Sequence, residues 1–447
     1  MATQSFIDRF RKAAYDLRAA NGANVAVIFA LAAVPMVGVV GAAVDYSRAN
    51  SVKAAMQAAA DATALMLSKT ASTLSTADLQ SQANSYFTAL LNRPEATGLT
   101  VNATYSTTGG SQIVVAATAD VKADFMGLIG VSSMKVGADS EVKWGNTRLR
   151  VALVLDNTGS MADDNKMTAL KSATNSLLDQ LKSSATNDGD VYVSIIPFSK
   201  DVNVGSSNYK QNWIDWTDWE ANNGSCSSSK YDNQDDCKSH NKTWTADSHK
   251  NWNGCVTDRG NSSGPANGNY DTNVSAPSTT VTASLFPAEQ YGSCTQAILP
   301  LSYNWTSMKT LVSGMQSNGN TNQGIGLAHG WMSLVGGGPY PAPPAMDSNY
   351  KYTQAIILLT DGLNTQNRWY TSQSSIDNRQ AITCANAKAA GIVLYTVQVN
   401  TGGDPTSSLL QKCATDATKF FLLTSSTQIV STFTSIGTAL SNLRIAQ

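Results

Sequence analysis

The sequence is poor in charge, and the charges that it has are balanced. Charged residues make up 14% of the 447 residues, whereas an ordinary soluble domain has about 25%. Lys and Arg total 31, Asp and Glu total 32, and the formal net charge is -1. Because no basic surplus is available to neutralise a phosphate backbone, we expect no nucleic-acid partner. The hydrophobic fraction of 42% is large enough to bury a sizeable core.

Cysteine is absent from the first half of the chain, and no C-x-x-C pair of the kind used in zinc or thioredoxin-like sites occurs. The six cysteines are Cys226, Cys237, Cys255, Cys294, Cys384 and Cys413. An even, dispersed set without a histidine cluster favours disulfides in an oxidising compartment, and six free buried thiols are the alternative. Cys384 and Cys413 flank the apolar segment GIVLYTVQV, so we expect them to pair. The other four are expected to pair among themselves, with three possible connectivities.

One apolar run is long enough to cross a membrane. Residues Val25 to Val44 contain no charged side chain, and as a helix these twenty residues span roughly 30 Å, the thickness of a bilayer core. Residues 1–24 carry Arg9, Arg11, Lys12 and Arg18, which predicts a cytoplasmic N-terminus with the bulk of the chain on the other side. A cleaved signal peptide ending near 41–43 is the alternative, and it would export the same domain without a tether.

Residues 45–147 change their periodicity partway along. Helix-forming residues with apolar positions at helical spacing predict helices over 52–69 and 76–91, the second with Thr76 as its N-cap. The alternation from Leu99 onward, with a turn at 109–110, then predicts three short strands. We interpret this region as a helical stalk that carries a small antiparallel sheet.

Residues 148–447 alternate between buried strands and helices. The strands are RVALVLD, VYVSIIPFS, QAIILLTDG, GIVLYTVQV and KFFLLTS. A helix is expected after the first strand, with Met167, Leu170, Leu177, Leu178 and Leu181 on one face, and further helices are expected over 324–334, 376–390, 406–413 and 427–443. Continuous apolar strands separated by helices predict an α/β fold with a doubly wound, mostly parallel sheet. Residues 201–300 lack this pattern but hold four cysteines and five tryptophans, which we interpret as an insertion held by disulfides because it cannot build its own core.

Three loops place oxygen-bearing side chains at the edge of the predicted sheet where ligands bind in open α/β folds. Asp156, Thr158 and Ser160 follow the first strand at alternate positions, Thr321 precedes a helix, and Asp361 ends an apolar strand. Two carboxylates and three hydroxyls suit a hard divalent cation, Mg2+ first and Mn2+ or Ca2+ as alternatives, but not zinc. A carboxylate from a partner protein could complete the shell. The alternative is that these residues only cap helices and turns.

The three loops resemble the metal-ion-dependent adhesion site of von Willebrand factor A domains, in the order Asp156-x-Thr158-x-Ser160, Thr321, Asp361. The middle position has Thr where many members have Ser, which keeps the hydroxyl. The resemblance implies a metal-dependent protein contact made by this domain.

Nearly the whole chain, least of all the cysteine-rich insertion, resembles the TadG-like proteins of tight-adherence (Flp) pilus assembly. The segments that carry the similarity are the apolar run ending AAVDYSRAN, the alanine-rich helix after it, and CANAKAAGIVLYTVQVN near the C-terminus. The resemblance implies a single-pass protein of the bacterial inner membrane with its bulk in the periplasm. It also implies contacts with other pilus-assembly or envelope proteins, and no enzymatic activity.

Two other functions compete with this interpretation. An enzyme has few candidates: His240 and His249 fall in the insertion, His329 falls on a helix face, and no G-x-S-x-G occurs. An aspartyl phosphatase would need a second acid at position 158, although the Asp156 and Asp361 pair could in principle assist metal-dependent hydrolysis. A secreted or surface adhesin is the stronger rival, because the same metal site would then bind a host or matrix ligand.

Overall fold

The computed structural model describes residues 21–108, 110–144, 147–261, 270–348 and 350–445; the side chains of 21–27, 30, 34, 128–129 and 443–445 are not described. The predicted basic segment 1–24 therefore lies almost entirely outside the described residues. The chain forms two compact units, Met1–Trp144 and Gly145–Gln447, which are described separately. The sequence predicted this boundary between 147 and 148.

The described part of the first unit begins with one long helix, α2 (Asn21–Leu67), which joins the apolar run to the helix predicted at 52–69. Pro35 lies inside it. Among the described residues, no helix meets the length and hydropathy expected of a membrane span. Apolar side chains in the run are nevertheless exposed, with Phe29 at 71% and Val39 at 72%. The predicted membrane anchor therefore stays a proposal.

The second part of α2 packs on a sheet, so the predicted stalk is a small α/β module. The sheet has the antiparallel order β1 (Ala96–Ser106), β2 (Ser111–Lys122), β3 (Ser133–Trp144), as predicted. Helix α3 (Thr76–Leu90) joins the same core, and its N-cap is Ser75 instead of the predicted Thr76, because the Ser75 hydroxyl accepts from the Asp78 N–H. Asp45 ties α2 to the β2–β3 connection by accepting the backbone N–H groups of residues 124–126 at 2.7–3.0 Å.

The second unit contains an eight-stranded sheet with the order β10-β6-β5-β4-β13-β14-β15, and β12 pairs with β5. Five neighbouring strands are parallel: β5 (Val191–Phe198), β4 (Thr147–Asp156), β13 (Lys351–Thr360), β14 (Val393–Val399) and, at the edge, β15 (Phe420–Leu423). The edge strands β6 (Val202–Asn203), β10 (Cys255–Val256) and β12 (Leu299–Ser302) are antiparallel and were not predicted.

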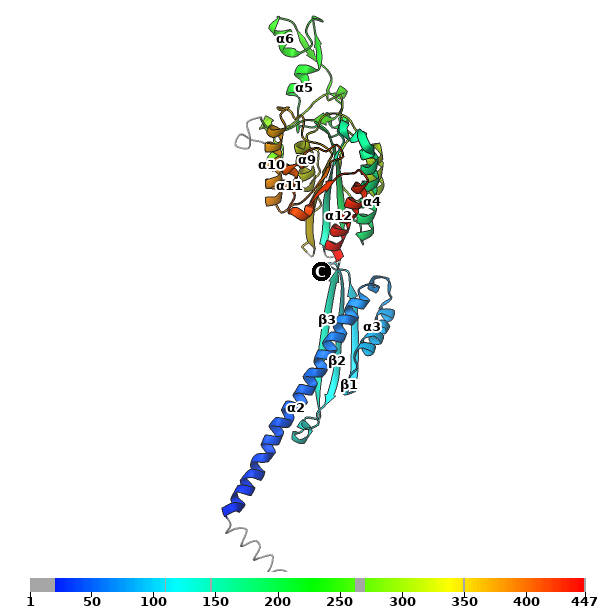
Figure 1. Ribbon diagram of the computed structural model, residues 1–447, viewed down its shortest axis with the longest axis vertical. Coiled ribbons are helices and arrows are strands. Elements are labelled where there is room, and N and C mark those ends of the chain that lie inside the picture. The colour runs from blue at the N-terminus through cyan, green and yellow to red at the C-terminus, as the bar shows by residue number, and fades with distance from the viewer. Residues whose placement is uncertain (1–20, 109, 145–146, 262–269, 349, 446–447) are drawn as a thin grey trace, which may run out of the picture. The chain divides into compact units, whose positions relative to one another are not determined.

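Helices cover both faces of this sheet, as predicted for a doubly wound fold (Figure 1). One face carries α4 (Lys166–Ser184), α8 (Trp305–Gly314) and α12 (Gln428–Ile445), and the other carries α9 (Gln323–Val335), α10 (Gln373–Ala389) and α11 (Ser408–Cys413). Helix α8 was not predicted because it follows the insertion directly. Most residues of β4, β5 and β14 and the second half of β13 are buried between these two helical layers, which explains their continuous apolar sequences.

The insertion begins where β5 ends, at the edge of the sheet that also holds Asp156, because Phe198 pairs with Asp156. Its elements are short: β7 (Ile214–Asp215), α5 (Thr217–Asn222), β8 (Gly224–Cys226), α6 (Gln234–Ser239), β9 (Trp244–Ala246), α7 (Tyr270–Asn273) and β11 (Phe286–Pro287). The insertion does not form a separate core, in agreement with the sequence, but its tryptophans are packed against the main sheet. Trp213, Trp219 and Trp252 are buried in the same apolar cluster as one face of the main sheet.

The structure contains three disulfides. Cys384 is joined to Cys413, linking α10 to α11 around β14 in the way expected from the sequence. The remaining pairs, Cys226–Cys237 and Cys255–Cys294, lie inside the insertion. Of the three connectivities that the sequence left open, the structure has the one in which each cysteine pairs with its neighbour along the chain.

Candidate metal centre

The first loop holds its carboxylate rigidly at the end of β4. Asp156 is fully buried. Its Oδ1 accepts the Thr158 N–H at 2.7 Å, and its Oδ2 accepts the Thr360 hydroxyl at 2.6 Å. The turn after Asp156 therefore starts from a fixed carboxylate, and this turn carries the hydroxyls of Thr158 and Ser160.

The third loop brings its carboxylate to the same place. Strands β4 and β13 are parallel neighbours, so their carboxyl ends meet at one edge of the sheet. The Ser160 hydroxyl donates to Asp361 Oδ1 at 2.7 Å, and the same hydroxyl lies 3.1 Å from Thr158 Oγ1. Asp156, Thr158, Ser160 and Asp361 are thus brought together as the sequence predicts.

The second loop lies against both of the others. The Gly159 N–H donates to the Gly319 carbonyl at 2.9 Å, which places the loop before α9 beside the first loop. Thr321 is buried, its N–H donates to the Thr365 hydroxyl, and its carbonyl accepts the Thr365 N–H at 2.9 Å. The backbone therefore holds Thr321 between the first and third loops.

Burial and mutual repulsion of the carboxyl groups dominate the electrostatics. Desolvation, and then the negative charge of Asp361, raise the pKa of Asp156 from 3.8 to about 7. Within the described residues, no three His, Cys, Asp or Glu side chains form a group that could hold a metal ion. The cluster of Asp156, Thr158, Ser160 and Asp361 contains two carboxylates and two hydroxyls. Such a donor set fits a hard divalent cation, which would stabilise the ionised pair.

Lys166 was missed by the sequence analysis. This first residue of α4 places Nζ 2.6 Å from Asp361 Oδ2, and its side chain is only 8% exposed. Nothing in the spacing of the motif indicates this contact, because Lys166 lies beyond Ser160 and follows an irregular turn, η3 (Gly159–Asn165). Thr360 was present in the quoted motif LLTDG, but its role in holding Asp156 was not predicted.

The histidines lie outside the centre. His329 is buried on α9, where Nδ1 lies 2.9 Å from the Tyr340 hydroxyl, and burial lowers its pKa to about 3. His249 stacks on the Trp216 ring in the insertion, and His240 stacks on Tyr231. His329 has the buried helix-face position expected from the sequence, whereas the ring contacts of His240 and His249 were not predicted.

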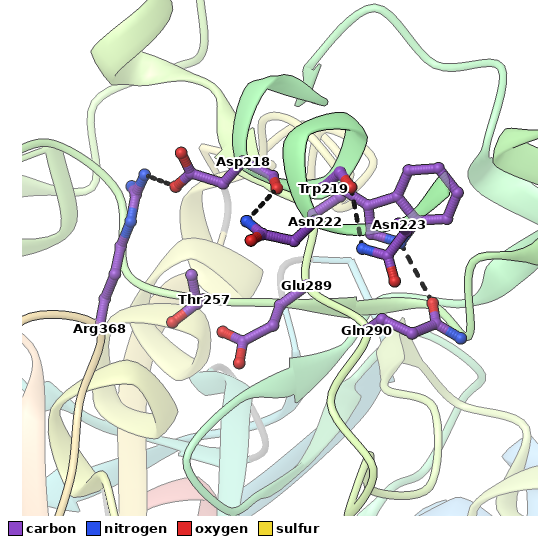
Figure 2. Close-up of a pocket in the computed structure, with 9 residues that line it drawn as sticks. Asp218, Trp219, Asn222, Asn223, Thr257, Glu289, Gln290 and Arg368 are labelled. Atoms are coloured by element: carbon purple, nitrogen blue, oxygen red, sulfur yellow. Dashed lines mark hydrogen bonds and ion pairs between the residues drawn. The ribbon is translucent and has the colours of Figure 1, made fainter. Parts of the chain in front are cut away.

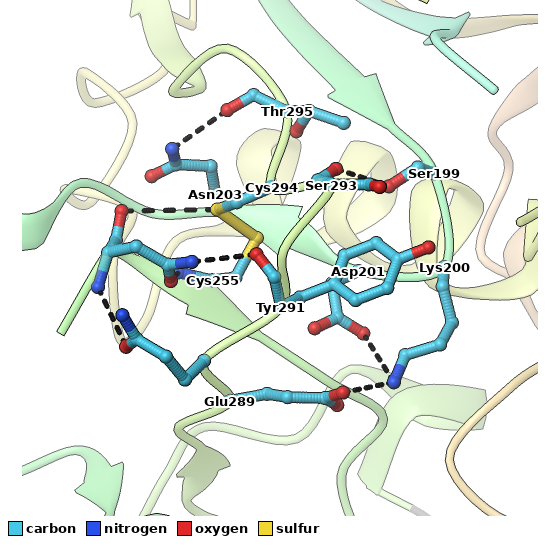
Figure 3. Close-up of a disulfide and its surroundings, with 12 residues drawn as sticks. Ser199, Lys200, Asp201, Asn203, Cys255, Glu289, Tyr291, Ser293, Cys294 and Thr295 are labelled. Carbon is cyan, nitrogen blue, oxygen red and sulfur yellow. Dashed lines mark hydrogen bonds and ion pairs between the residues drawn. A yellow bond between two sulfur atoms is a disulfide. The ribbon is translucent and has the colours of Figure 1, made fainter. Parts of the chain in front are cut away.

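Figure 3 shows the Cys255–Cys294 disulfide of the insertion and the side chains around it, including Tyr291, Glu289 and Lys200. The Cys255–Cys294 disulfide fixes the segment that carries Tyr291, whose hydroxyl accepts the Asn320 N–H at 3.0 Å. Lys200 forms an ion pair with Glu289 beside the Tyr291 ring. The insertion is therefore bonded to the loop that precedes Thr321.

A polar pocket of about 320 Å³ opens beside the insertion helix α5 (Figure 2). Its wall includes Arg368, which pairs with Asp218 at 2.5 Å, and Glu289, which pairs with Lys200. Asp258 Oδ2 accepts two hydrogen bonds, one from the backbone N–H of Arg368 and one from the side-chain amide of Asn322, the residue after Thr321. The charges of the pocket wall are thus already paired.

Comparison with known proteins finds a family only at the N-terminal end. Residues 23–66 match the family model described as putative Flp pilus-assembly TadE/G-like, which confirms the predicted resemblance for this segment. No curated protein sequence matches the chain.

Several solved structures are similar to the chain at low identity. The pilus adhesin SpaC from Lactobacillus rhamnosus GG is 12% identical, with 79% of this chain covered and a TM-score of 0.38; the match spans 35% of SpaC. The vWF domain of the type V pili tip protein Mfa5 from Porphyromonas gingivalis is 9% identical over 67% of this chain and 97% of its own, with a TM-score of 0.37. A single-residue mutant of the PilB minor pilin from Streptococcus sanguinis is 11% identical over 78% of this chain and 79% of its own, with a TM-score of 0.36.

Proposed function

We propose that this chain is a membrane-anchored, non-enzymatic assembly protein of a Flp-type pilus, and that its second unit makes metal-dependent contacts with other pilus or envelope proteins. The observation that carries the proposal is the meeting of three separate loops at the carboxyl edge of the sheet. Asp156, Thr158, Ser160, Thr321 and Asp361 would hold the ion, with Mg2+ as the expected species. A carboxylate of the partner would fill the open position.

The hydroxyl-rich donor set supports a role in binding. Two carboxylates neutralise a divalent cation without excess negative charge, so the ion keeps an attraction for an incoming carboxylate. The described histidines lie outside the centre, and Lys166, the basic group nearest to Asp361, is held in an ion pair. The residues around the centre therefore favour a contact site over a hydrolytic one.

Anchoring through the apolar part of α2 is supported by its exposure. Ile28, Phe29, Leu31 and Val39 are each at least 65% exposed, and apolar side chains of this size are costly to leave in water. We propose that residues 25–44 lie in the bacterial inner membrane with the N-terminus in the cytoplasm and the second unit in the periplasm. The three disulfides of the second unit are compatible with that oxidising compartment.

The test is a pull-down from solubilised membranes with the unmodified chain and with Asp156→Asn, each with and without chelator. We expect a set of partners that is retained by the unmodified chain with Mg2+ and lost both on chelation and in the variant. Retention of the same partners in all four samples would contradict a metal-dependent contact.

An adhesin with the same metal site is the second candidate. The insertion supports this second candidate, because the insertion starts at the edge of the sheet that holds the centre and would widen a contact face there. Cell fractionation separates the two candidates. An uncleaved protein in the inner membrane supports assembly, whereas a released or surface-exposed protein supports adhesion.

A further inference from the structure

Two ordinary rules of protein structure disfavour a lysine at position 166, and the turn before it has an uncommon backbone conformation. Its side chain is only 8% exposed, although Lys is almost never fully buried unless it is paired. It occupies the first position of α4, where the helix dipole favours negative charge. The two residues before it, Asp164 and Asn165, both adopt left-handed backbone conformations, with φ of 52° and 58°.

These unfavourable features converge on one contact. The Lys166 ammonium reaches Asp361 Oδ2 at 2.6 Å, while Asp361 Oδ1 is held by Ser160 at 2.7 Å. The Asp361 side chain is itself fully buried, so removal of the ammonium would leave one carboxylate oxygen without a partner. The strained turn therefore serves to bring a positive charge to a ligand of the candidate metal centre.

We infer that Lys166 is a tethered cation that competes with the divalent ion for Asp361 and so sets the affinity of the centre. The inference rests on the proposed metal site. In the metal-free protein the ammonium neutralises Asp361. A divalent ion in the same oxygen cluster repels the ammonium, so binding displaces Lys166 and relaxes the left-handed turn that begins α4.

Through this competition, the surface of the second unit would respond to whether the metal site is occupied. The turn before Lys166 is exposed, and the Asp164 carbonyl accepts the Ser426 hydroxyl at 2.7 Å in the segment before α12. Displacement of Lys166 is therefore expected to alter backbone contacts of both helices that pack together on this face, α4 and α12.

The inference is tested by calorimetric titration of Mg2+ and of Mn2+ into the full chain and three variants. Lys166→Met removes the charge but keeps the length of the side chain. Lys166→Arg keeps the charge. Lys171→Met, on the same helix with its ammonium bonded to the Ser313 carbonyl, is the matched control.

We expect Lys166→Met to bind Mg2+ at least about tenfold more tightly than the unmodified chain, and Lys171→Met to bind like the unmodified chain. Lys166→Arg is expected to bind no more tightly than the unmodified chain. Thermal unfolding provides a second readout: without metal Lys166→Met unfolds at a lower temperature than the unmodified chain, and saturating Mg2+ removes the difference.

The outcomes separate this inference from the proposed function. If the unmodified chain binds Mg2+ and Lys166→Met binds it equally or more weakly, the competition is refuted while the metal site stands. If neither protein binds Mg2+ or Mn2+, both the competition and the metal site are refuted. Binding by Lys166→Met alone would support both.

Discussion

At the scale of single residues, the centre is a small set of oxygens whose charges are not balanced by the protein alone. Asp156 is buried beside Asp361, and the nearest described cation, Lys166, bonds only to the second of them. The sequence could indicate that Asp156, Thr158, Ser160 and Asp361 lie together, because they follow apolar strands whose carboxyl ends meet at one edge of the sheet. Their role as metal ligands stays a prediction. The motif did not predict Lys166, because burial and ion pairing depend on how α4 packs, and that information is not local in sequence.

The pH dependence of stability follows from Asp156. Its pKa in the folded chain is about 7 and its ordinary value is 3.8, so between these values the folded state holds a proton that the unfolded state has lost. The free energy of unfolding of the metal-free protein should therefore fall as pH rises through this window. Asp156→Asn, which cannot titrate, should flatten this slope in thermal or denaturant unfolding, whereas Asp247→Asn, at an exposed position of the insertion, should not.

The stabilisation of the protein by Mg2+ should increase as pH rises. Mg2+ requires the ionised form of Asp156, so it must displace the proton that the metal-free protein keeps below about pH 7. The rise in melting temperature caused by Mg2+ should be larger at about pH 8 than at about pH 5. An equal rise at both values would mean that Asp156 is not a ligand.

At the scale of elements, the periodicity of apolar residues predicted the long helices and the parallel strands. The elements that were not predicted are those whose positions depend on tertiary packing and not on a local sequence pattern. The apolar run and the predicted helix at 52–69 are one helix, α2, since no Gly or Pro interrupts the chain between 44 and 67. The two-residue strands β6 and β10 are too short for a pattern to detect. The insertion looked coreless because its buried tryptophans share the core of the main sheet instead of forming a periodic pattern of their own.

The apolar part of α2 gives a prediction with a matched control on the same helix. Val39→Arg should release the protein from the membrane fraction, because Val39 is 72% exposed within the apolar run. Leu65→Arg should not, because Leu65, which is 60% exposed, lies beyond the run. The measurement is membrane flotation with immunodetection. Equal retention of both variants would contradict anchoring by residues 25–44.

The disulfide between α10 and α11 should contribute to global stability. Replacing Cys384 and Cys413 together by Ser should lower the free energy of unfolding by about 3 kcal/mol, as expected for a closed loop of this size. Both sulfurs are buried in the main core cluster. The double replacement of Cys226 and Cys237 by Ser should cost less in denaturant unfolding, since this pair joins β8 to α6 outside the main core cluster.

At the scale of the whole molecule, the chain is two units with separate cores joined near residue 145. The sequence placed this junction closely, because the alternation of short strands gives way there to strands buried on both faces. It could not give the disulfide connectivity of the insertion or its bonds to the loop before Thr321, because these depend on contacts between distant segments. The family match covers only 23–66, so the function of the second unit rests on its own geometry.

The separation into units predicts that residues 145–447 fold without the first unit. This fragment should form all three disulfides and bind Mg2+ with the affinity of the full chain, because every residue of the centre lies within it. Thiol titration and calorimetry are the measurements. Loss of Mg2+ binding in a fragment that remains folded would show that the first unit contributes to the centre.

The most direct test of the central claim is anomalous diffraction from crystals of the second unit grown with Mn2+. The account predicts one strong peak enclosed by the loops of Asp156, Thr321 and Asp361, at roughly 2.2 Å from its oxygen ligands. It also predicts that the Lys166 ammonium has moved away from Asp361. A map with no peak in that cluster, from crystals in which the ion is shown to be present, would contradict the claim that the three loops enclose a metal ion.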